Sequence, residues 1–287
     1  MSYDIVFNAD GSVSLPDLPA DLFPAVRALQ APLPKAAAGT VGDRPELVSD
    51  GSPRWWHTRH TPVPLTPSAL AEAPTDVLWD LHAAQTEART WHGTSGEAPG
   101  ERVTLFDLKV ELARRSLLAC DLCARQCGAD RWHGEPGACG SAREASVTRV
   151  FLNWSEDPHL RPGVSVFLSG CNWDCVYCQY PENLDAHAGQ IVAPTRLAAR
   201  IAALWRQGAT NVHWVGGNPD QHLWTVLRTL QQCEAPIPVI WNTNGYASPT
   251  TLRLLDGVVD VYLVDFRHGT SACAQRYGVP GDSVDII

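Results

Sequence analysis

The sequence has little of what would place a protein in a membrane or on nucleic acid. No apolar run reaches membrane-spanning length, and the start, Met-Ser-Tyr-Asp-Ile-Val, lacks a basic region followed by an apolar one. Basic residues are few: 22 Lys and Arg stand against 31 Asp and Glu, for a net charge of −9. Nucleic acid is therefore disfavoured as a partner, and we expect a soluble cytoplasmic protein.

Cysteines, in contrast, are abundant and grouped. The 287 residues, enough for one large domain or two small ones, include nine cysteines, and seven of these fall between positions 120 and 178. An odd total in tight clusters suits metal ligation better than a framework of disulfides. Cys233 and Cys273 have no partner spacing, and we expect each to be a buried or surface thiol.

The first cluster is Cys171, Cys175 and Cys178, at spacing C-x3-C-x2-C. It directly follows the apolar run 164–170, which predicts a buried strand ended by a glycine turn. Three thiolates on one short loop can hold three irons of a [4Fe–4S] cluster and leave the fourth iron open for chemistry. The alternatives are a zinc knuckle that lacks one ligand, or thiols that are simply buried.

This arrangement resembles the signature of the radical SAM superfamily. The resemblance implies that the open iron binds the amino and carboxylate groups of S-adenosylmethionine (SAM). One electron from the cluster then cleaves SAM to methionine and a 5′-deoxyadenosyl radical. Tyr177 stands where the family favours an aromatic residue, just before the last cysteine and beside the adenine.

The second cluster is Cys120, Cys123, Cys127 and Cys139, at spacing C-x2-C-x3-C-x11-C. Four thiolates are a full ligand set for one zinc ion or for a second [4Fe–4S] cluster, and we favour the iron–sulfur cluster. His133 could replace one cysteine, which would favour zinc.

Residues 120–140, the tripeptide Glu156-Asp-Pro158 and the central motif together resemble one branch of the superfamily. These are proteins similar to pyruvate formate-lyase activating enzyme that carry an extra N-terminal cysteine quartet. The resemblance implies that the second centre relays electrons or binds substrate.

Beyond Cys178 the pattern alternates between helix and strand, which implies parallel βαβ units with the ligand at the carboxyl ends of the strands. We predict strands at 211–217, 237–241 and 259–264, and helices at 195–207, 221–233 and 249–255.

Each predicted strand ends in residues that resemble a SAM-contacting motif of the family. The resemblance implies that the glycines and Asn218 receive the methionine amino group, and that Asp265 and Arg267 address the ribose and the carboxylate. Asn218 and Asn242 stand where the family has acids, so they add no charge. The residues concerned are Gly216, Gly217, Asn218, Asn242, Asn244, Asp265 and Arg267.

The first 115 residues match no pattern that fixes a function. We expect a hairpin from 4–7 and 12–15, helices at 19–29, 76–91 and 104–118, and a linker between 31 and 54. The apolar spacing predicts inward faces for two of these helices, formed by Val77, Leu78, Leu81 and Ala84, and by Leu105, Leu108, Leu112 and Leu117 or Leu118. The stretch Trp55-Trp-His-Thr-Arg-His60 is either an aromatic plug or part of a pocket wall. We predict that it lies within contact distance of the cavity above the first cluster.

The expected architecture is α/β: an irregular and helical extension (1–115), an auxiliary metal segment (116–145) and a partial (βα) radical SAM barrel (146–287). The barrel is shortened at its C-terminus, although 283–287 could begin a fifth strand. Residues 1–110 or a second chain, as in a homodimer, could supply the missing wall, or the wall is absent.

The expected function is radical SAM catalysis on a small polar metabolite, as a rearrangement, oxidation or sulfur insertion in a biosynthetic pathway. It requires an external electron donor such as flavodoxin or ferredoxin, and the sequence identifies no further catalytic residue. The alternatives are a glycyl-radical-enzyme activase that acts on a protein glycine, and a non-catalytic iron–sulfur or zinc protein.

Overall fold

The computed structural model describes residues 6–7, 13–14, 52–88 and 102–287. The chain forms two compact units, 1–44 and 45–287. In the first unit, β1 (Val6–Phe7) pairs antiparallel with β2 (Val13–Ser14), which confirms the two strands of the predicted hairpin. The predicted helix at 19–29 lies outside the described residues.

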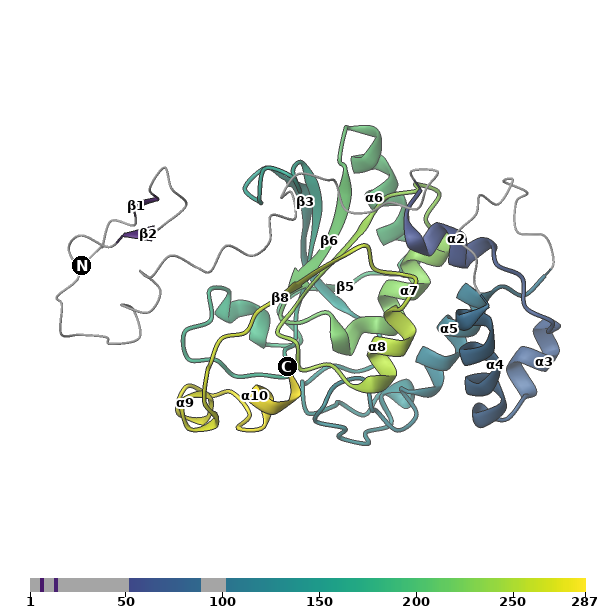
Figure 1. The fold of residues 1–287 in the computed structure, drawn as a ribbon, viewed down its shortest axis with the longest axis horizontal. Helices are drawn as coiled ribbons and strands as arrows, with labels where there is room; N and C mark the ends of the chain where they lie inside the picture. The colour runs from purple at the N-terminus through teal and green to yellow at the C-terminus, as the bar shows by residue number, and fades with distance from the viewer. Residues whose placement is uncertain (1–5, 8–12, 15–51, 89–101) are drawn as a thin grey trace. The chain divides into compact units, whose positions relative to one another are not determined.

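The second unit is built on one six-stranded sheet in the order β5-β3-β4-β6-β7-β8 (Figure 1). Strands β4, β6, β7 and β8 are parallel to one another, as the alternating pattern predicted. The strands are β3 (Ser146–Asn153), β4 (Gly163–Leu168), β5 (Gln190–Ile191), β6 (Asn211–Gly216), β7 (Val239–Thr243) and β8 (Val261–Val264).

Strands β3 and β5 were not predicted, and they extend the sheet beyond β4. β3 pairs antiparallel with β4 along its whole length, and β5 pairs antiparallel with the start of β3. Among the described residues, the wall on this side of the sheet therefore comes from 146–191 and not from 1–110.

The predicted fifth strand at 283–287 is wrong. Ser283–Ile286 form the short helix α10, which follows α9 (Ser271–Arg276). The chain turns back after β8, and the hydroxyl of Tyr246 donates to the carboxylate of Asp282 at 2.8 Å. The C-terminal segment therefore packs beside the cysteine loop instead of joining the sheet edge at β8.

Helices α6 (Pro194–Arg206), α7 (Leu223–Gln232) and α8 (Pro249–Leu255) lie on one side of the sheet (Figure 1). Their apolar residues recur every three or four positions, and alternate strand residues face them. The core that results is apolar and buried. Its members include Leu197, Ile201, Leu223, Val226, Leu230, Val164, Val166, Trp214, Val239 and Trp241.

The extension contributes an outer layer of helices. These are α2 (Arg54–His60), α3 (Pro67–Glu72), α4 (Thr75–Glu87) and α5 (Leu105–Arg115). α5 begins at a capping box between Thr104 and Asp107 and packs against α4 and α7. Within the described residues, no helix is long and apolar enough to cross a membrane.

The predicted inward faces of the helices in the extension are correct for α5 and only partly correct for α4. In α5 the predicted inward residues Leu105, Leu108 and Leu112 are buried. In α4, Leu78 is buried, but Val77, which we predicted to face inward, is exposed. Its apolar side chain has no layer to pack against because α4 already lies at the outside of the unit.

The prediction that residues 55–60 reach the cavity above the first cluster is wrong. The indole N–H of Trp55 donates to the carbonyl of Ile237 at 2.8 Å. The hydroxyl of Thr58 donates to the carbonyl of Gly257 at 2.7 Å. These carbonyls lie just before β7 and β8, so α2 packs at the amino ends of the strands, away from the cysteine loop. Trp55 is fully buried, so this stretch is the aromatic plug.

Candidate active site

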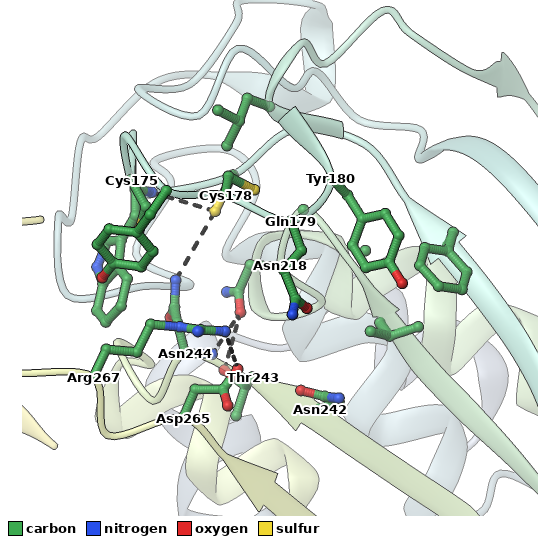
Figure 2. A pocket seen from close by; sticks show the side chains of 18 of the residues that line it. Cys175, Cys178, Gln179, Tyr180, Asn218, Asn242, Thr243, Asn244, Asp265 and Arg267 are labelled. Atoms are coloured by element: carbon green, nitrogen blue, oxygen red, sulfur yellow. Dashed lines mark hydrogen bonds and ion pairs between the residues drawn. The ribbon is translucent and has the colours of Figure 1, made fainter. Parts of the chain in front are cut away.

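One cavity of about 260 Å³ lies at the carboxyl ends of the four parallel strands (Figure 2). Its lining includes the three cysteines of the first cluster and every residue that the sequence assigned to SAM. These are Cys171, Cys175, Cys178, Tyr177, Gly216, Gly217, Asn218, Asn242, Asn244, Asp265 and Arg267. The lining contains no described residue from 52–115.

The cysteine loop follows β4 and is held from both sides. The backbone N–H of Trp173 points at the Cys171 thiol at 3.4 Å, and the indole of Trp173 packs in a small core with Tyr246. Backbone hydrogen bonds from Asp174 and Val176 tie the loop to the C-terminal segment. Burial raises the pKa of the Cys171 thiol to about 12, which favours the protonated form. Metal binding would have to displace that proton, because the thiolate is the form that ligates.

The glycine pair at the end of β6 lets that strand approach the start of the cysteine loop. A Cβ on Gly216 would lie 2.3 Å from the carbonyl oxygen of Leu168, and one on Gly217 would lie 2.0 Å from that of Gly170. Gly216 also has a φ of +118°, which disfavours any larger residue. The pair therefore joins β6 to the backbone that carries Cys171.

The side chain of Asn218 is committed to a buried network. Its amide nitrogen donates to Asp220 at 3.0 Å and to Gln221 at 3.1 Å, and its oxygen accepts from the backbone N–H of Asn244 at 3.1 Å. Asp220, which is fully buried, also accepts from Trp241 and Thr243, each at 2.8 Å. Asn218 therefore has no amide proton left for a ligand and acts as part of the cavity wall.

The two other asparagines differ in their freedom. Asn244 donates to Asn172 at 2.7 Å and lies 4.0 Å from the sulfur of Cys171. Among the described residues, the side-chain amide of Asn242 has no hydrogen-bond partner, and Figure 2 shows it beside the cavity. Asn242 therefore retains both a donor and an acceptor for a bound molecule.

Charged and aromatic groups complete the mouth of the cavity. Arg267 pairs with Asp265 at 2.6 Å, and Figure 2 shows both facing the cysteine loop. The phenol of Tyr177 is 2.6 Å from His268, whose other ring nitrogen is 3.3 Å from Cys273. Cys273 is half-buried and Cys233 is fully buried, so neither joins a cysteine set, as predicted.

The cysteine quartet lies outside the cavity and surrounds a buried cation. Cys120, Cys123 and Cys139 are buried, and Cys127 is exposed. The guanidinium of Arg131, fully buried, donates to the Cys120 sulfur at 3.5 Å, and a Cβ on Gly137 would lie 3.5 Å from the sulfurs of both Cys127 and Cys139.

A buried cation is costly unless an anion compensates it, and deprotonated thiols would do so. The other hydrogen bonds of Arg131 go to the carbonyls of Ser141 and Ala142. The residues of the quartet therefore fit an anionic metal–thiolate centre. His133 instead pairs with Asp130 on the surface, at 2.9 Å.

The sulfurs of the cysteine triplet, and those of the quartet, are not arranged around one point as ligands of a single ion would be. Within the described residues, no three His, Cys, Asp or Glu side chains are arranged to hold a single metal ion. A [4Fe–4S] cluster makes a different demand, because it spreads its thiolates over separate irons.

A short polar bridge connects the two cysteine sets. The side chain of Asn172 lies close enough to Cys123 to lower the pKa of that thiol, and it accepts from Asn244, which also contacts Cys171. Arg125, within the quartet loop, donates to the carbonyl of Asn172 at 2.6 Å. The quartet therefore lies directly behind the loop that carries the triplet.

Several residues of the cavity were missed from the sequence. Asp220, which supports the cavity from behind Asn218, has a visible signal, since it stands two positions after Asn218 and begins the helix that follows a strand end. Glu156 was noted within Glu156-Asp-Pro158 but was given no role. Phe167, Trp173, Gln179, Tyr180 and Thr243 also line the cavity and carried no distinguishing signal.

Two buried histidines near the cavity predict an acid-sensitive fold. Burial lowers the pKa of His213 to about 4 and that of His222 to about 3, and the nearby Arg131 adds to the shift at His222. An unfolded histidine has a pKa of about 6.5. Below that pH the unfolded chain binds protons that the folded chain does not, so stability is lost as the pH falls from about 6.5 towards 4.

We expect the free energy of unfolding to fall by on the order of 3 kcal/mol between about pH 6.5 and 4.5 through these two groups. Urea unfolding at several pH values measures it. The double variant His213→Gln and His222→Gln should have a flatter profile, and equal slopes for the two proteins would contradict the assignment.

Comparison with known proteins is informative about the domain and less so about the substrate. Residues 165–287 match the radical SAM superfamily. The chain is 36% identical over 191 residues to an uncharacterized protein of Methanocaldococcus jannaschii, which covers 64% of this chain and 55% of that protein. It is 26% identical over 153 residues to 7-carboxy-7-deazaguanine synthase of Methanothermobacter thermautotrophicus. That alignment covers 49% of this chain and 60% of the synthase. The chain thus spans little more than half the length of these relatives.

Proposed function

Because residues 165–287 form a radical SAM domain, we propose that the protein is an enzyme that generates a 5′-deoxyadenosyl radical from SAM. The family implies a [4Fe–4S] cluster and SAM as cofactors. The observation that carries the proposal is that three thiols and three strand ends, far apart in the sequence, line one cavity. When bound, the cluster supplies the electron that cleaves SAM.

The residues of the chain would bind and orient the cluster and SAM. Cys171, Cys175 and Cys178 would hold the cluster, and the backbone N–H of Trp173 would stabilise the thiolate of Cys171. Arg267 is placed to receive the carboxylate of SAM, because a guanidinium presents a fork of donors to a carboxylate.

The methionine amino group needs an acceptor, and Asn218 is already committed. The amide oxygen of Asn242 and the backbone at 216–217 are the better candidates, since both line the cavity. Tyr177 would lie beside the adenine and Asp265 beside the ribose, as the resemblance implies.

We propose that the quartet holds a second [4Fe–4S] cluster that relays electrons rather than binding substrate. The four cysteines do not line the described cavity, which argues against substrate contact. The bridge through Asn172 and the proximity of Cys123 to the cysteine loop favour transfer between the two centres. An external donor such as flavodoxin or ferredoxin would supply the electron.

Metal content tests the two sets together. Anaerobically reconstituted protein should contain about eight irons, from two four-iron clusters. Replacing the four quartet cysteines by alanine should reduce the content to about four and leave the triplet loaded. Iron and zinc are measured by elemental analysis. Four irons with one zinc would replace the second cluster by a zinc site, and protein without iron would contradict both assignments.

We propose a small polar molecule as substrate. The expected roof at residues 55–60 no longer supports this choice, because that stretch packs elsewhere. The support now comes from the cavity itself, which is small and lined by amides, a carboxylate and an ion pair. The type of reaction stays open between rearrangement, oxidation and sulfur insertion.

A protein glycine is the second candidate, and the surface around the cavity favours it. Val176 and Phe266, which lie on the loops at the mouth, are 73% and 58% exposed. A protein segment that reached the cavity past these two loops would contact both side chains. The predicted homodimer stays a prediction.

A fractionated cell extract separates the two candidates. We expect the low-molecular-weight fraction, and not the protein fraction, to accelerate formation of 5′-deoxyadenosine by the reduced enzyme. Stimulation by the protein fraction alone, with a glycyl radical in the electron paramagnetic resonance spectrum, would favour the activase.

A further inference from the structure

We infer that Glu156, backed by His213, forms the substrate-recognition end of the cavity and binds a nitrogen cation such as an amine or amidine. The inference rests on the proposed function and names the chemical class of the substrate. Glu156 lines the cavity but belongs to none of the strand-end motifs that resemble SAM contacts.

The position of Glu156 follows from the strand register. Ser165 on β4 pairs with His213 on β6, and Phe167 pairs with Val215, so these four side chains share one face of the sheet. Phe167 and Val215 line the cavity, which identifies this as the face opposite the helices. His213 stands three residues before the end of β6, so this part of the sheet lies deeper than the cysteine loop.

The carboxylate of Glu156 is held by one of its two oxygens. The amide nitrogen of Asn153 donates to Oε1 of Glu156 at 3.1 Å and to Ser165 at 3.0 Å, while the backbone N–H of Ser155 holds the amide oxygen at 2.8 Å. Among the described residues, Oε2 has no hydrogen-bond partner. One oxygen is therefore fixed and the other remains available to a ligand.

His213 does not supply the missing cation. It is 1% exposed, and neither ring nitrogen has a hydrogen-bond partner in the described part of the chain. Its Nδ1 lies 3.4 Å from Oε1 of Glu156. Because burial lowers the pKa of His213 to about 4, the ring is neutral near pH 7. Burial also raises the pKa of Glu156, as expected for a carboxylate without a cation beside it.

The charge balance of the cavity selects the class of ligand. Its charged residues are Glu156, Asp265 and Arg267, and the last two pair with each other. Within the described lining, the carboxylate of Glu156 is thus the charge that the chain leaves uncompensated. A ligand cation would compensate it and a ligand anion would be repelled, since a partly buried charge is stable only when paired.

The walls beside Glu156 suit a flat or partly apolar body on that cation. Phe167 and Tyr180 line the cavity with their rings 5.1 Å apart, and Arg149 already lies over both from outside the lining. Aromatic faces attract guanidinium-like groups. An aromatic amidine therefore combines the two features that the site offers.

Calorimetric titration of the reconstituted holoenzyme with benzamidine, in the presence of SAM, tests the inference. Benzamidine should bind and benzoate should not. Glu156→Gln, which keeps the shape of the side chain, should weaken benzamidine binding at least tenfold, and Glu156→Asp should weaken it less. The control Glu72→Gln removes an exposed carboxylate at the end of α3, outside the cavity lining, and should bind as wild type.

The outcomes separate this inference from the proposed function. Glu156→Gln should weaken benzamidine binding more than it weakens SAM binding, and an equal loss of both affinities would assign Glu156 to the cofactor and overturn the inference. No benzamidine binding to wild type, equal binding of benzoate, or unchanged binding in Glu156→Gln would each also overturn it. If wild type fails to cleave SAM, the proposed function falls, whatever benzamidine does.

Discussion

Replacing Cys171, Cys175 and Cys178 together by alanine should abolish the formation of 5′-deoxyadenosine. These thiols are the ligands that the cavity offers to the cluster, and without them no iron is placed beside the SAM-contacting strand ends. The measurement is chromatographic detection of 5′-deoxyadenosine after reduction with dithionite. The iron content should fall from about eight to about four atoms, because the quartet is untouched.

Cys233→Ala is the matched control, since it removes a buried thiol at the end of α7, which lines no part of the cavity. It should retain both iron and cleavage. Formation of 5′-deoxyadenosine by the triple variant at the wild-type rate would refute the assignment of the triplet.

Asp220→Ala should both destabilise the fold and weaken SAM binding. Asp220 is fully buried and accepts hydrogen bonds from Asn218, Trp241 and Thr243, so alanine leaves three buried donors short of an acceptor. Each unsatisfied buried group costs about 1–3 kcal/mol, and Asn218 and Thr243 keep other partners. We expect the free energy of unfolding to fall by about 3 kcal/mol, with roughly tenfold weaker SAM binding.

Urea unfolding and SAM titration measure the two effects. Asp220→Asn is a milder variant that serves as the control. Its amide oxygen can still accept from Trp241, but its amide nitrogen cannot accept the hydrogen bonds from Asn218 and Thr243. It should lose less stability than the alanine variant. A change in unfolding free energy below about 0.5 kcal/mol for Asp220→Ala would contradict the role of this network.

Local sequence pattern predicted the parts of the fold that local physics decides. The spacing of Leu105, Leu108 and Leu112 predicted a helix over 104–118, and the structure forms α5 there at Leu105–Arg115. The apolar run before Cys171 specifies β4, and the glycine pair at 216–217 marks the end of β6.

Placement across the chain was not predictable in this way. Trp55 donates to a carbonyl 182 residues later, and nothing in the local pattern of Trp, His and Arg indicates which end of the sheet they occupy. Strand β3 was missed because most of its residues are only partly buried and show no regular alternation, and because its pairing partner had already been counted as a barrel strand.

The cavity shows the same division. The motifs follow successive parallel strands, whose carboxyl ends lie at one edge of the sheet. Their positions in the sequence therefore predicted that these residues share one cavity. The role expected of Asn218 was not readable, since its amide group is occupied by Asp220 and Gln221. Hydrogen-bond saturation is a property of the packed structure and has no counterpart in the spacing of a motif.

The pairing of β3 with β4 bears on how this protein can be divided for experiments. The stretch shared with the superfamily begins at residue 165, inside β4 and after the whole of β3. A recombinant fragment cut at that boundary would lose the strand partner of β4, the Asn153 contact to Ser165 and the α5 layer over α7. The stretch that matches the superfamily is therefore shorter than the packed unit 45–287, and a fragment for expression should begin before α2.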